Sequence, residues 1–354
     1  MKGESMKNFD EQVKLIFRLA QKYNKYPKAT YWLNLLATAV LAWGLFIAAY
    51  LSDGLVQRAI YLVPSIFALY RLATFTHEVV HIKKGQVPGF RLAWSVLCGI
   101  PLLAPHFMYR ELHLAHHSKN KYNTDKDIEY FPFFGKAFSM HTYYFKNLAL
   151  PFLSLYRFAI LPLTFFVGGK IRNLIEQKAS CMGIRFVFTR EKLKNKTERK
   201  YWVIEEMATF IYVWSIIGLI TSNNLAIDLV YQWAVAMVAI LTLNTFRFLS
   251  ATHLYWGQGE KMTFEQHIMD SVNIKNKGVF AKLIAPVGQT YHGLHHIVPF
   301  VPGLELHKLH KDIMSEIDES HFYHKINYEG FLQVYGLLLK GKGPEHETQK
   351  LEAA

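Results

Sequence analysis

Cysteine is almost missing from this chain of 354 residues. The two that are present, Cys98 and Cys181, cannot build a framework of several disulfides and offer no cysteine-based metal spacing. Two cysteines are also too few to hold an iron–sulfur cluster. The sequence contains no H-P-G-G haem motif and no flavin motif. The chain therefore provides no recognisable electron carrier of its own.

Acidic residues are scarce, with 27 Asp and Glu against 40 Lys and Arg, and the formal net charge is +13. A basic composition often indicates nucleic-acid binding, but no nucleic-acid motif accompanies it here. The excess lies in the N-terminal segment, in residues 169–200 and in the C-terminal tail. The first thirty residues also lack the early apolar core of a cleavable signal peptide. We therefore expect no nucleic-acid partner, and we attribute the charge to membrane topology.

Charge is absent from residues 31–51, a span long enough to cross a bilayer. Three further apolar runs occupy residues 59–75, 207–222 and 225–246. Under the positive-inside rule, the basic segments between and beyond these runs lie in the cytoplasm. The sequence therefore predicts an all-α integral membrane helical bundle with about four transmembrane helices. A cytoplasmic helical cap would complete the fold, and the active site would lie on the cytoplasmic side.

Three regions are expected along the chain. Residues 1–30 form a cytoplasmic amphipathic N-terminal segment, residues 31–315 a membrane-embedded catalytic domain, and residues 316–354 a cytoplasmic C-terminal tail. In the first region, one side of an amphipathic helix would face the lipid surface; that side comprises Phe9, Val13, Ile16, Phe17 and Ala20. An ordinary surface helix on a membrane domain would show the same pattern.

A short motif, His77-Glu78-Val79-Val80-His81, matches the H-E-x-x-H signature of zinc metalloproteases. On a helix, His77 and His81 lie one turn apart on one face, so both imidazoles can reach one metal. Glu78 would then be the base that activates a zinc-bound water. Taken alone, however, the five residues are as compatible with a histidine pair that binds nothing.

The other histidines decide between these interpretations. Of 17 histidines, six occur in two H-x-x-H-H clusters, which are His113, His116 and His117, and His292, His295 and His296. Positions i, i+3 and i+4 share a helical face, so each cluster can offer three imidazoles in one direction. Eight imidazoles are too many for one catalytic zinc, which takes three protein ligands. They suit two transition metals. An iron pair that uses oxygen is the economical choice, although ligand type alone does not exclude two zincs.

The three histidine boxes, "HEVVH", "HLAHH" and "HGLHH", resemble those of the integral-membrane fatty acid desaturases, which are non-haem di-iron enzymes. Their order and approximate spacing match the family. The flanking stretches "YRELHLAHHSKNKYNTDKDIEYFP" and "RFLSATHLYWGQGEKMTFEQHIMDSVNI" are also similar to it. The resemblance covers roughly residues 30–315. It is specific for the superfamily and less specific for the reaction.

The resemblance implies O2-dependent removal of two vicinal hydrogens from the chain of an acyl-lipid or acyl-thioester substrate. It implies two Fe2+ ions as cofactor, O2 as co-substrate and a separate electron donor of the ferredoxin or cytochrome b5 type. It also suggests His253, in "ATHLY", as a ninth ligand. Where the family has an asparagine four residues earlier, this chain has Leu249. The nine expected metal ligands are His77, His81, His113, His116, His117, His253, His292, His295 and His296.

Other functions remain open at this point. A lipid or carotenoid hydroxylase or ketolase could use the same scaffold. Remoter alternatives are an H-E-x-x-H zinc membrane protease and a non-catalytic membrane protein that retains a metal site. The protease interpretation leaves six histidines in two matching clusters without a purpose.

Two proline-containing segments constrain the topology. If residues 91–109 crossed the membrane, the second histidine box would lie on the opposite side from the first. Pro101 and Pro105 would each disrupt a straight helix there. We expect this segment to dip in and return, or to lie buried against other helices. The same holds for residues 147–167.

Several polar residues beside the boxes receive weaker predictions. Glu78 is expected to orient a ligand histidine or to point to solvent. Asp125, Asp127 and Glu129 could do the same work or form a solvated acidic loop. No site role is expected for the remaining histidines, which are His106, His141, His267, His307, His310, His321, His324 and His346.

Overall fold

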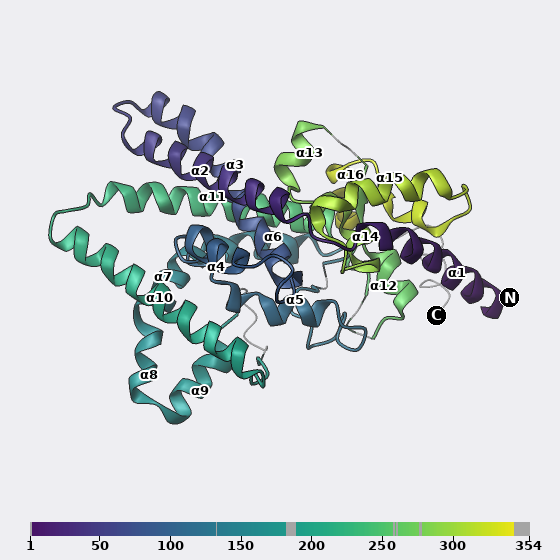
Figure 1. The fold of residues 1–354 in the computed structure, drawn as a ribbon, viewed down its shortest axis with the longest axis horizontal. Coiled ribbons are helices and arrows are strands. Elements are labelled where there is room, and N and C mark those ends of the chain that lie inside the picture. The colour runs from purple at the N-terminus through teal and green to yellow at the C-terminus, as the bar shows by residue number, and fades with distance from the viewer. Residues whose placement is uncertain are drawn as a thin grey trace. The chain divides into compact units, whose positions relative to one another are not determined.

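The computed structural model describes residues 2–131, 133–181, 189–257, 259, 261–275 and 278–342. The described chain is helical almost throughout (Figure 1). Its two short strands, β1 (Asn273–Ile274) and β2 (Asn327–Tyr328), pair in parallel. The prediction of an all-α membrane bundle is confirmed.

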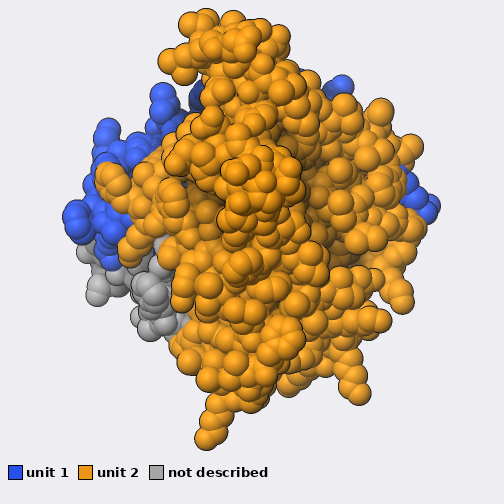
Figure 2. All heavy atoms as spheres, turned by 90° about the vertical axis from the view of Figure 1, so that its left-hand side faces the viewer, with its two compact units in different colours: residues 1–28, 115–142, 244–354 blue, residues 29–114, 143–243 orange. Residues whose placement is uncertain are grey.

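The chain divides into two compact units, coloured separately in Figure 2. Unit 1 comprises residues 1–28, 115–142 and 244–354, and unit 2 comprises residues 29–114 and 143–243. These boundaries follow contacts in space, whereas the three predicted regions follow the sequence, and the division of those regions stays a prediction.

Unit 2 contains the long apolar helices. Its elements are α2 (Lys28–Tyr50), α3 (Leu55–His81), α4 (Phe90–Trp94), the π-helical turn η2 (Ser95–Gly99), η3 (His106–Met108), α7 (Leu150–Ile160), η4 (Leu161–Leu163), α8 (Thr164–Val167), α9 (Gly169–Lys178) and α10 (Lys196–Thr221). Three helices run from one unit into the other, namely α5 (Arg110–His116), α6 (Ala137–Leu148) and α11 (Asp228–Ala251).

Five stretches are long and apolar enough to cross a membrane: Lys28–Tyr50, Leu55–His81, Leu150–Val167, Lys196–Thr221 and Asp228–Ala251. Large apolar side chains on these helices are strongly exposed, including Val40 (74%) and Leu55 (84%). Exposed apolar surface of this extent suits contact with lipid. The protein is therefore an integral membrane protein. The number of candidate spans is one more than expected, because the stretch from α7 to α8 is long enough to be counted.

The segment 91–109 is broken, as expected from its prolines. The helical stretch Phe90–Gly99 is ten residues long, or about 15 Å, which is half of the ~30 Å hydrocarbon core. The chain turns after Gly99, passes Leu103 at a positive φ of 53° and re-forms a helical turn at η3. Residues 147–167 differ, because α7, η4 and α8 together span 18 residues. The predicted dip of that second segment is therefore not tested.

Buried charges attach the middle of the chain to α10. Glu206 accepts hydrogen bonds from Arg157 on α7 and Arg172 on α9, each at 2.6 Å. Glu205 accepts from Ser95 Oγ at 2.7 Å and from the backbone N–H of Phe107 at 3.1 Å. Buried carboxylates require such partners, because an unpaired charge is strongly destabilising away from water. Glu205 thus fixes the broken segment 91–109 against α10, and Glu206 fixes α7 and α9 against the same helix.

Unit 1 contains the shorter elements. They are α1 (Lys2–Ala20), η1 (Gln21–Tyr23), α12 (Phe264–Asp270), α13 (Val279–Ile284), η5 (Gln289–Tyr291), α14 (His292–Ile297), η6 (Gly303–Glu305), α15 (Leu306–Glu316), η7 (Phe322–Ile326) and α16 (Phe331–Lys340). Its core joins α1, α14, α15 and η7 in one cluster of buried apolar side chains.

The amphipathic helix α1 differs from the lipid-facing prediction. Phe9, Val13, Ile16 and Ala20 are buried in the core of unit 1, and only Phe17 is exposed. The apolar face of α1 packs on protein and not on lipid because α15 presents a matching apolar face, with Leu309 and Ile313 fully buried. The C-terminal region is also less tail-like than expected. Residues 316–342 include buried core residues of η7 and α16, while residues 343–354, with His346, lie outside the described residues.

Candidate metal centre

Four of the predicted ligands converge inside unit 1. The ligand nitrogens of His116, His253, His292 and His296 all lie within 4.8 Å of one another, and all four side chains are buried. The Nε2 of His253 is 3.0 Å from the Nε2 of His116 and 3.0 Å from that of His292. The Nε2 of His292 is in turn 3.0 Å from that of His296. His253, predicted from outside the three boxes, thus lies among the box histidines.

Residues 270–272, at the end of α12 and just after it, bring His253 next to α14. Residues 252–254 pair with this extended strip: Leu254 N–H donates to Asp270 O and Val272 N–H donates to Thr252 O, both at 2.9 Å. On the other side, the N–H of Gly293 donates to Val272 O at 2.9 Å. The extended strip therefore holds the end of α11 and the start of α14 beside each other.

A tight turn places the third box. Gly288 precedes η5 with a positive φ of 79°, and an added Cβ there would lie 2.2 Å from the carbonyl oxygen of Gly303. Only glycine combines this backbone conformation with so close an approach. The turn therefore directs the chain from α13 into α14, where the sequence "HGLHH" begins.

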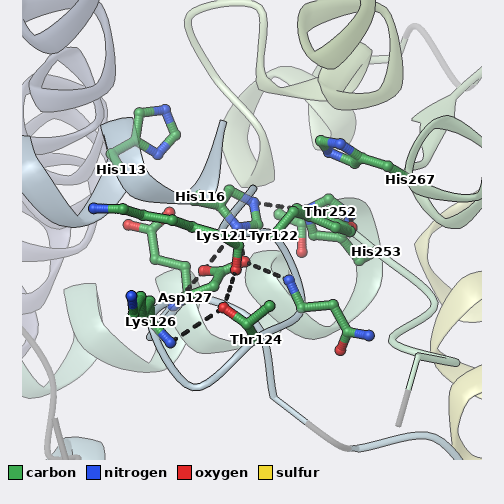
Figure 3. A network of polar contacts seen from close by, with 12 residues as sticks. His113, His116, Lys121, Tyr122, Thr124, Lys126, Asp127, Thr252, His253 and His267 are labelled. Carbon is green, nitrogen blue, oxygen red and sulfur yellow. Dashed lines mark hydrogen bonds and ion pairs between the residues drawn. The ribbon is translucent and has the colours of Figure 1, made fainter. Parts of the chain in front are cut away.

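The Nδ1 atoms of these histidines have partners of their own. Asp127 accepts from Nδ1 of His116 at 3.0 Å (Figure 3). The hydroxyl of Tyr122 lies 3.0 Å from Nδ1 of His253 and donates to Asp270 at 2.9 Å. A partner on Nδ1 fixes the tautomer and the ring orientation, and it leaves Nε2 as the coordinating atom.

Burial keeps two of the four imidazoles, those of His253 and His296, in the neutral form that binds metals. Burial lowers the pKa of His253 and of His296 well below the ordinary value of histidine. Burial acts in the same direction on His116, but Asp127 outweighs it and raises the pKa of that imidazole. Burial also raises the pKa of Asp270 to about 7. Neutral imidazoles retain the lone pair that a metal ion requires.

The donor set fits a transition-metal ion. Each neutral imidazole has one N–H. In His116, His253 and His296 this proton would lie on Nδ1, which has a hydrogen-bonding partner in each case. Several Nε2 lone pairs would then face one another at 3.0 Å, which is repulsive without a cation between them. Imidazoles that share a metal at about 2.0–2.1 Å bring neighbouring nitrogens to roughly 3.0–3.4 Å of each other. The observed spacing agrees with that range.

Unit 2 contains a second group of three predicted ligands. The Nε2 atoms of His81 and His113 are 3.0 Å apart, and the ring of His77 lies 4.5 Å from that of His113. Glu78 is buried, contacts Nδ1 of His77 at 3.4 Å and accepts a hydrogen bond from the hydroxyl of Tyr31. Glu78 thus lies beside a predicted ligand histidine, which agrees with the first of its two expected placements, and it does not point to solvent.

The last two predicted ligands form a pair in unit 1. Nε2 of His117 lies 3.1 Å from Nε2 of His295, and the ring of His117 stacks on that of His296 at 4.3 Å. All nine predicted ligands therefore belong to a histidine group within one unit or the other. Leu249 is fully buried, and nearby Asn244 accepts hydrogen bonds from Arg247.

Two of the acidic residues after the second box differ in burial. Asp127 is fully buried against His116, whereas Asp125 is exposed to solvent. Asp127 therefore fits the expected support of a ligand histidine, and Asp125 fits the expected solvated loop.

His267 was assigned no role from sequence, and the structure differs. Its Nε2 lies 2.7 Å from Nδ1 of His296, and its ring stacks on Tyr122 at 3.5 Å between centroids. Burial lowers the pKa of His267 well below the ordinary histidine value. No local sequence pattern marks His267, because its contact with His296 joins residues 29 positions apart.

We expect His267→Ala to weaken metal binding by about 10–100-fold, as loss of a partner that orients a ligand does. The helix should stay folded, since Thr263 and Gln266 form its capping box independently. Metal titration of the purified apoprotein measures the affinity directly. The exposed His307 serves as the control position. An affinity equal to that of His307→Ala would contradict the orienting role.

Comparison with known proteins agrees with this geometry. A family model described as fatty acid desaturase matches residues 60–327. The chain is 33% identical over 315 residues to a ceramide hydroxylase from Caulobacter vibrioides (strain NA1000 / CB15N), and the match covers 88% of each chain. No solved structure matches the chain.

The family match includes all three histidine boxes, so "HEVVH" is the first of them and not a protease motif. The fold, the grouped histidines and the family match agree with the resemblance drawn from the sequence. The chain belongs to the fatty acid desaturase family of integral membrane oxidoreductases.

Proposed function

We propose that this protein is an O2-dependent lipid hydroxylase that acts on a ceramide-type lipid with a histidine-bound pair of iron ions. The observation that carries the proposal is the relative named ceramide hydroxylase, because 33% identity extends over 88% of both chains. From the sequence alone, a desaturase is the first expectation and a hydroxylase the alternative. An acyl-lipid desaturase is the other candidate, and the description of the matching family favours it.

Two metal sites follow from counting ligands. His116, His253, His292 and His296 of unit 1 make one complete set of four. The pair His117 and His295 is too small to hold a metal alone, and the three histidines of unit 2 leave coordination positions open. The nine predicted ligands exceed what one iron takes, and we propose a second iron beside the complete set. When bound, the irons would supply the activation of O2 for attack on an unactivated C–H bond.

The residues of the chain hold and orient this centre. Asp127, Tyr122 and His267 fix the rings of three unit 1 histidines through Nδ1, and Glu78 does so for His77. These contacts prevent the rings from rotating and so fix the position of each Nε2. The ligand set is therefore organised before any metal enters. All four unit 1 histidines are buried, which keeps bulk water away from the proposed metal site.

We propose that a separate protein supplies the electrons, as the sequence resemblance implies. We propose an acidic one-electron carrier of the ferredoxin or cytochrome b5 type, which a basic cytoplasmic face would attract. The active site would then lie on the cytoplasmic side. The acyl carrier of the substrate, whether a lipid amide, a glycerolipid or a thioester, follows from the product assay below.

Mass spectrometry of lipids separates the candidate reactions. The protein is expressed in a bacterial host supplied with ceramide, with a His292→Ala variant as the inactive control. A hydroxylase yields a lipid heavier by one oxygen atom, whereas a desaturase yields one lighter by two hydrogens. We expect the oxygenated ceramide from the wild-type protein alone. Unsaturated products without oxygen would replace the proposal with the desaturase, and identical lipids in both cultures would reject both.

A further inference from the structure

A hollow of about 570 Å³ lies among the apolar helices of unit 2. Its walls come from α2, α7, α10 and α11, and its floor from the turn after η2. The lining includes Trp43, Phe46, Leu103, Ala159, Ile217 and Trp233. Its volume is within the range of sites for small molecules, and its lining is almost wholly apolar.

The hollow lies far from the histidine end of these helices. Tyr31 on α2 contacts Glu78, the neighbour of His77 on α3, and so marks that end of the hairpin. Trp43 follows Tyr31 by twelve residues on the same helix, which places it about 18 Å further along the axis. Ile47, another lining residue, is about 24 Å along. Because the hydrocarbon core is ~30 Å thick, the hollow belongs to the leaflet opposite the three histidines of unit 2.

The floor of the hollow is the tip of the broken segment 91–109. Irregular backbone at membrane depth persists only where its polar groups are satisfied and protein or another filler covers it. Two wall residues satisfy carbonyls at this tip. The indole N–H of Trp43 donates to Leu97 O at 2.8 Å, and that of Trp233 donates to Pro101 O at 3.0 Å. The indoles cap the carbonyls, but they leave the space above the tip to be filled.

The size and chemistry of the hollow select its occupant. A membrane-crossing helix needs about 20 residues and would place only a short part of its length in a hollow of about 570 Å³, so a helix of a partner or of a second copy fits it poorly. Water is excluded by the apolar lining, since a buried water needs several polar partners. A single hydrocarbon chain matches both the volume and the lining.

We propose that the hollow binds one acyl chain of a membrane lipid in the leaflet opposite the histidines, and that this chain seals the tip of the broken segment. The lipid is a structural component and not the substrate. The proposal concerns unit 2 alone, and it holds whichever reaction the enzyme performs.

Filling the hollow tests the proposal. Ala159→Trp places an indole in the space, and Val40→Trp adds the same side chain to a lipid-facing position of α2 outside the lining. Phospholipid retained by protein purified in mild detergent is quantified by mass spectrometry. We expect wild type and Val40→Trp to retain lipid, and Ala159→Trp to retain several-fold less. The melting temperature of the wild type should fall on delipidation and recover with added phospholipid, while that of Ala159→Trp should change little.

A second variant and a labelling experiment test the proposal if Ala159→Trp does not fold. Ile217→Phe fills less of the hollow and should lower lipid retention to an intermediate value. In the wild type, a phospholipid with a photoreactive acyl chain should label peptides containing residues 155–160 and 212–217. Equal lipid retention in all variants, or labelling elsewhere, would overturn the proposal. Unchanged retention with an altered chain length of the product would assign the hollow to the substrate tail instead.

Discussion

Alanine at position 253 is expected to lower iron content and abolish turnover as fully as alanine at position 295. His253 is fully buried, and its Nε2 lies within 3.0 Å of two other ligand nitrogens. It follows α11 outside the three boxes, so it looks like an ordinary polar residue at the end of a membrane helix. Removing it takes one of four imidazoles from a set that is otherwise preorganised.

Iron analysis of purified protein, together with turnover and gel filtration, tests this expectation. The matched control is His307→Ala, which removes an exposed histidine from the same unit and should keep full iron and turnover. A folded His253→Ala protein with full iron and near-normal turnover would remove His253 from the site and leave eight ligands. Zinc in place of iron in the wild-type protein would instead contradict the di-iron centre.

Asp127→Asn is expected to weaken metal binding by about 10–100-fold and to lower turnover accordingly. Asp127 accepts from His116 Nδ1 at 3.0 Å and from the backbone N–H groups of Asn123 and Glu129 at 3.2 and 3.1 Å. Asparagine keeps the shape but has only one accepting oxygen, so it cannot satisfy the imidazole and the backbone together. His116 would lose the carboxylate that fixes its tautomer.

Asp125→Asn provides the control, because Asp125 lies in the same loop but is exposed to solvent. Metal affinity measured by titration of the apoproteins should differ between the two variants, with Asp125→Asn near wild type. Equal affinity in both would mean that Asp127 acts only as an acidic loop residue. Loss of folding in Asp127→Asn without added metal, but recovery with it, would still support the orienting role.

The motif spacing was enough to predict that the box histidines group together. Positions i, i+3 and i+4 share a helical face whatever the fold, so each H-x-x-H-H cluster specifies its own geometry. His253 needed the resemblance of "ATHLY", since no local pattern marks it. His267 was missed, because its importance depends on a contact with His296, 29 residues further along the chain.

The fate of the amphipathic helix was likewise beyond the sequence. The spacing of Phe9, Val13 and Ile16 specifies an apolar face, but a lipid surface and a protein core satisfy such a face equally. Only the presence of α15 in the folded unit decides for the protein core. The sequence also could not tell Asp125 from Asp127. The two lie only two residues apart, but Asp125 is exposed and Asp127 is buried.

The sequence by itself determined the membrane class, the breaks at Pro101 and Pro105 and the identity of the histidine boxes. Each of these depends on local properties, namely hydropathy, the missing N–H of proline and helical periodicity. The tertiary structure decided which polar residues contact the predicted ligands and where the hollow between α2, α7, α10 and α11 lies. Those features depend on contacts between residues distant in sequence, and short-range patterns carry no information about such contacts.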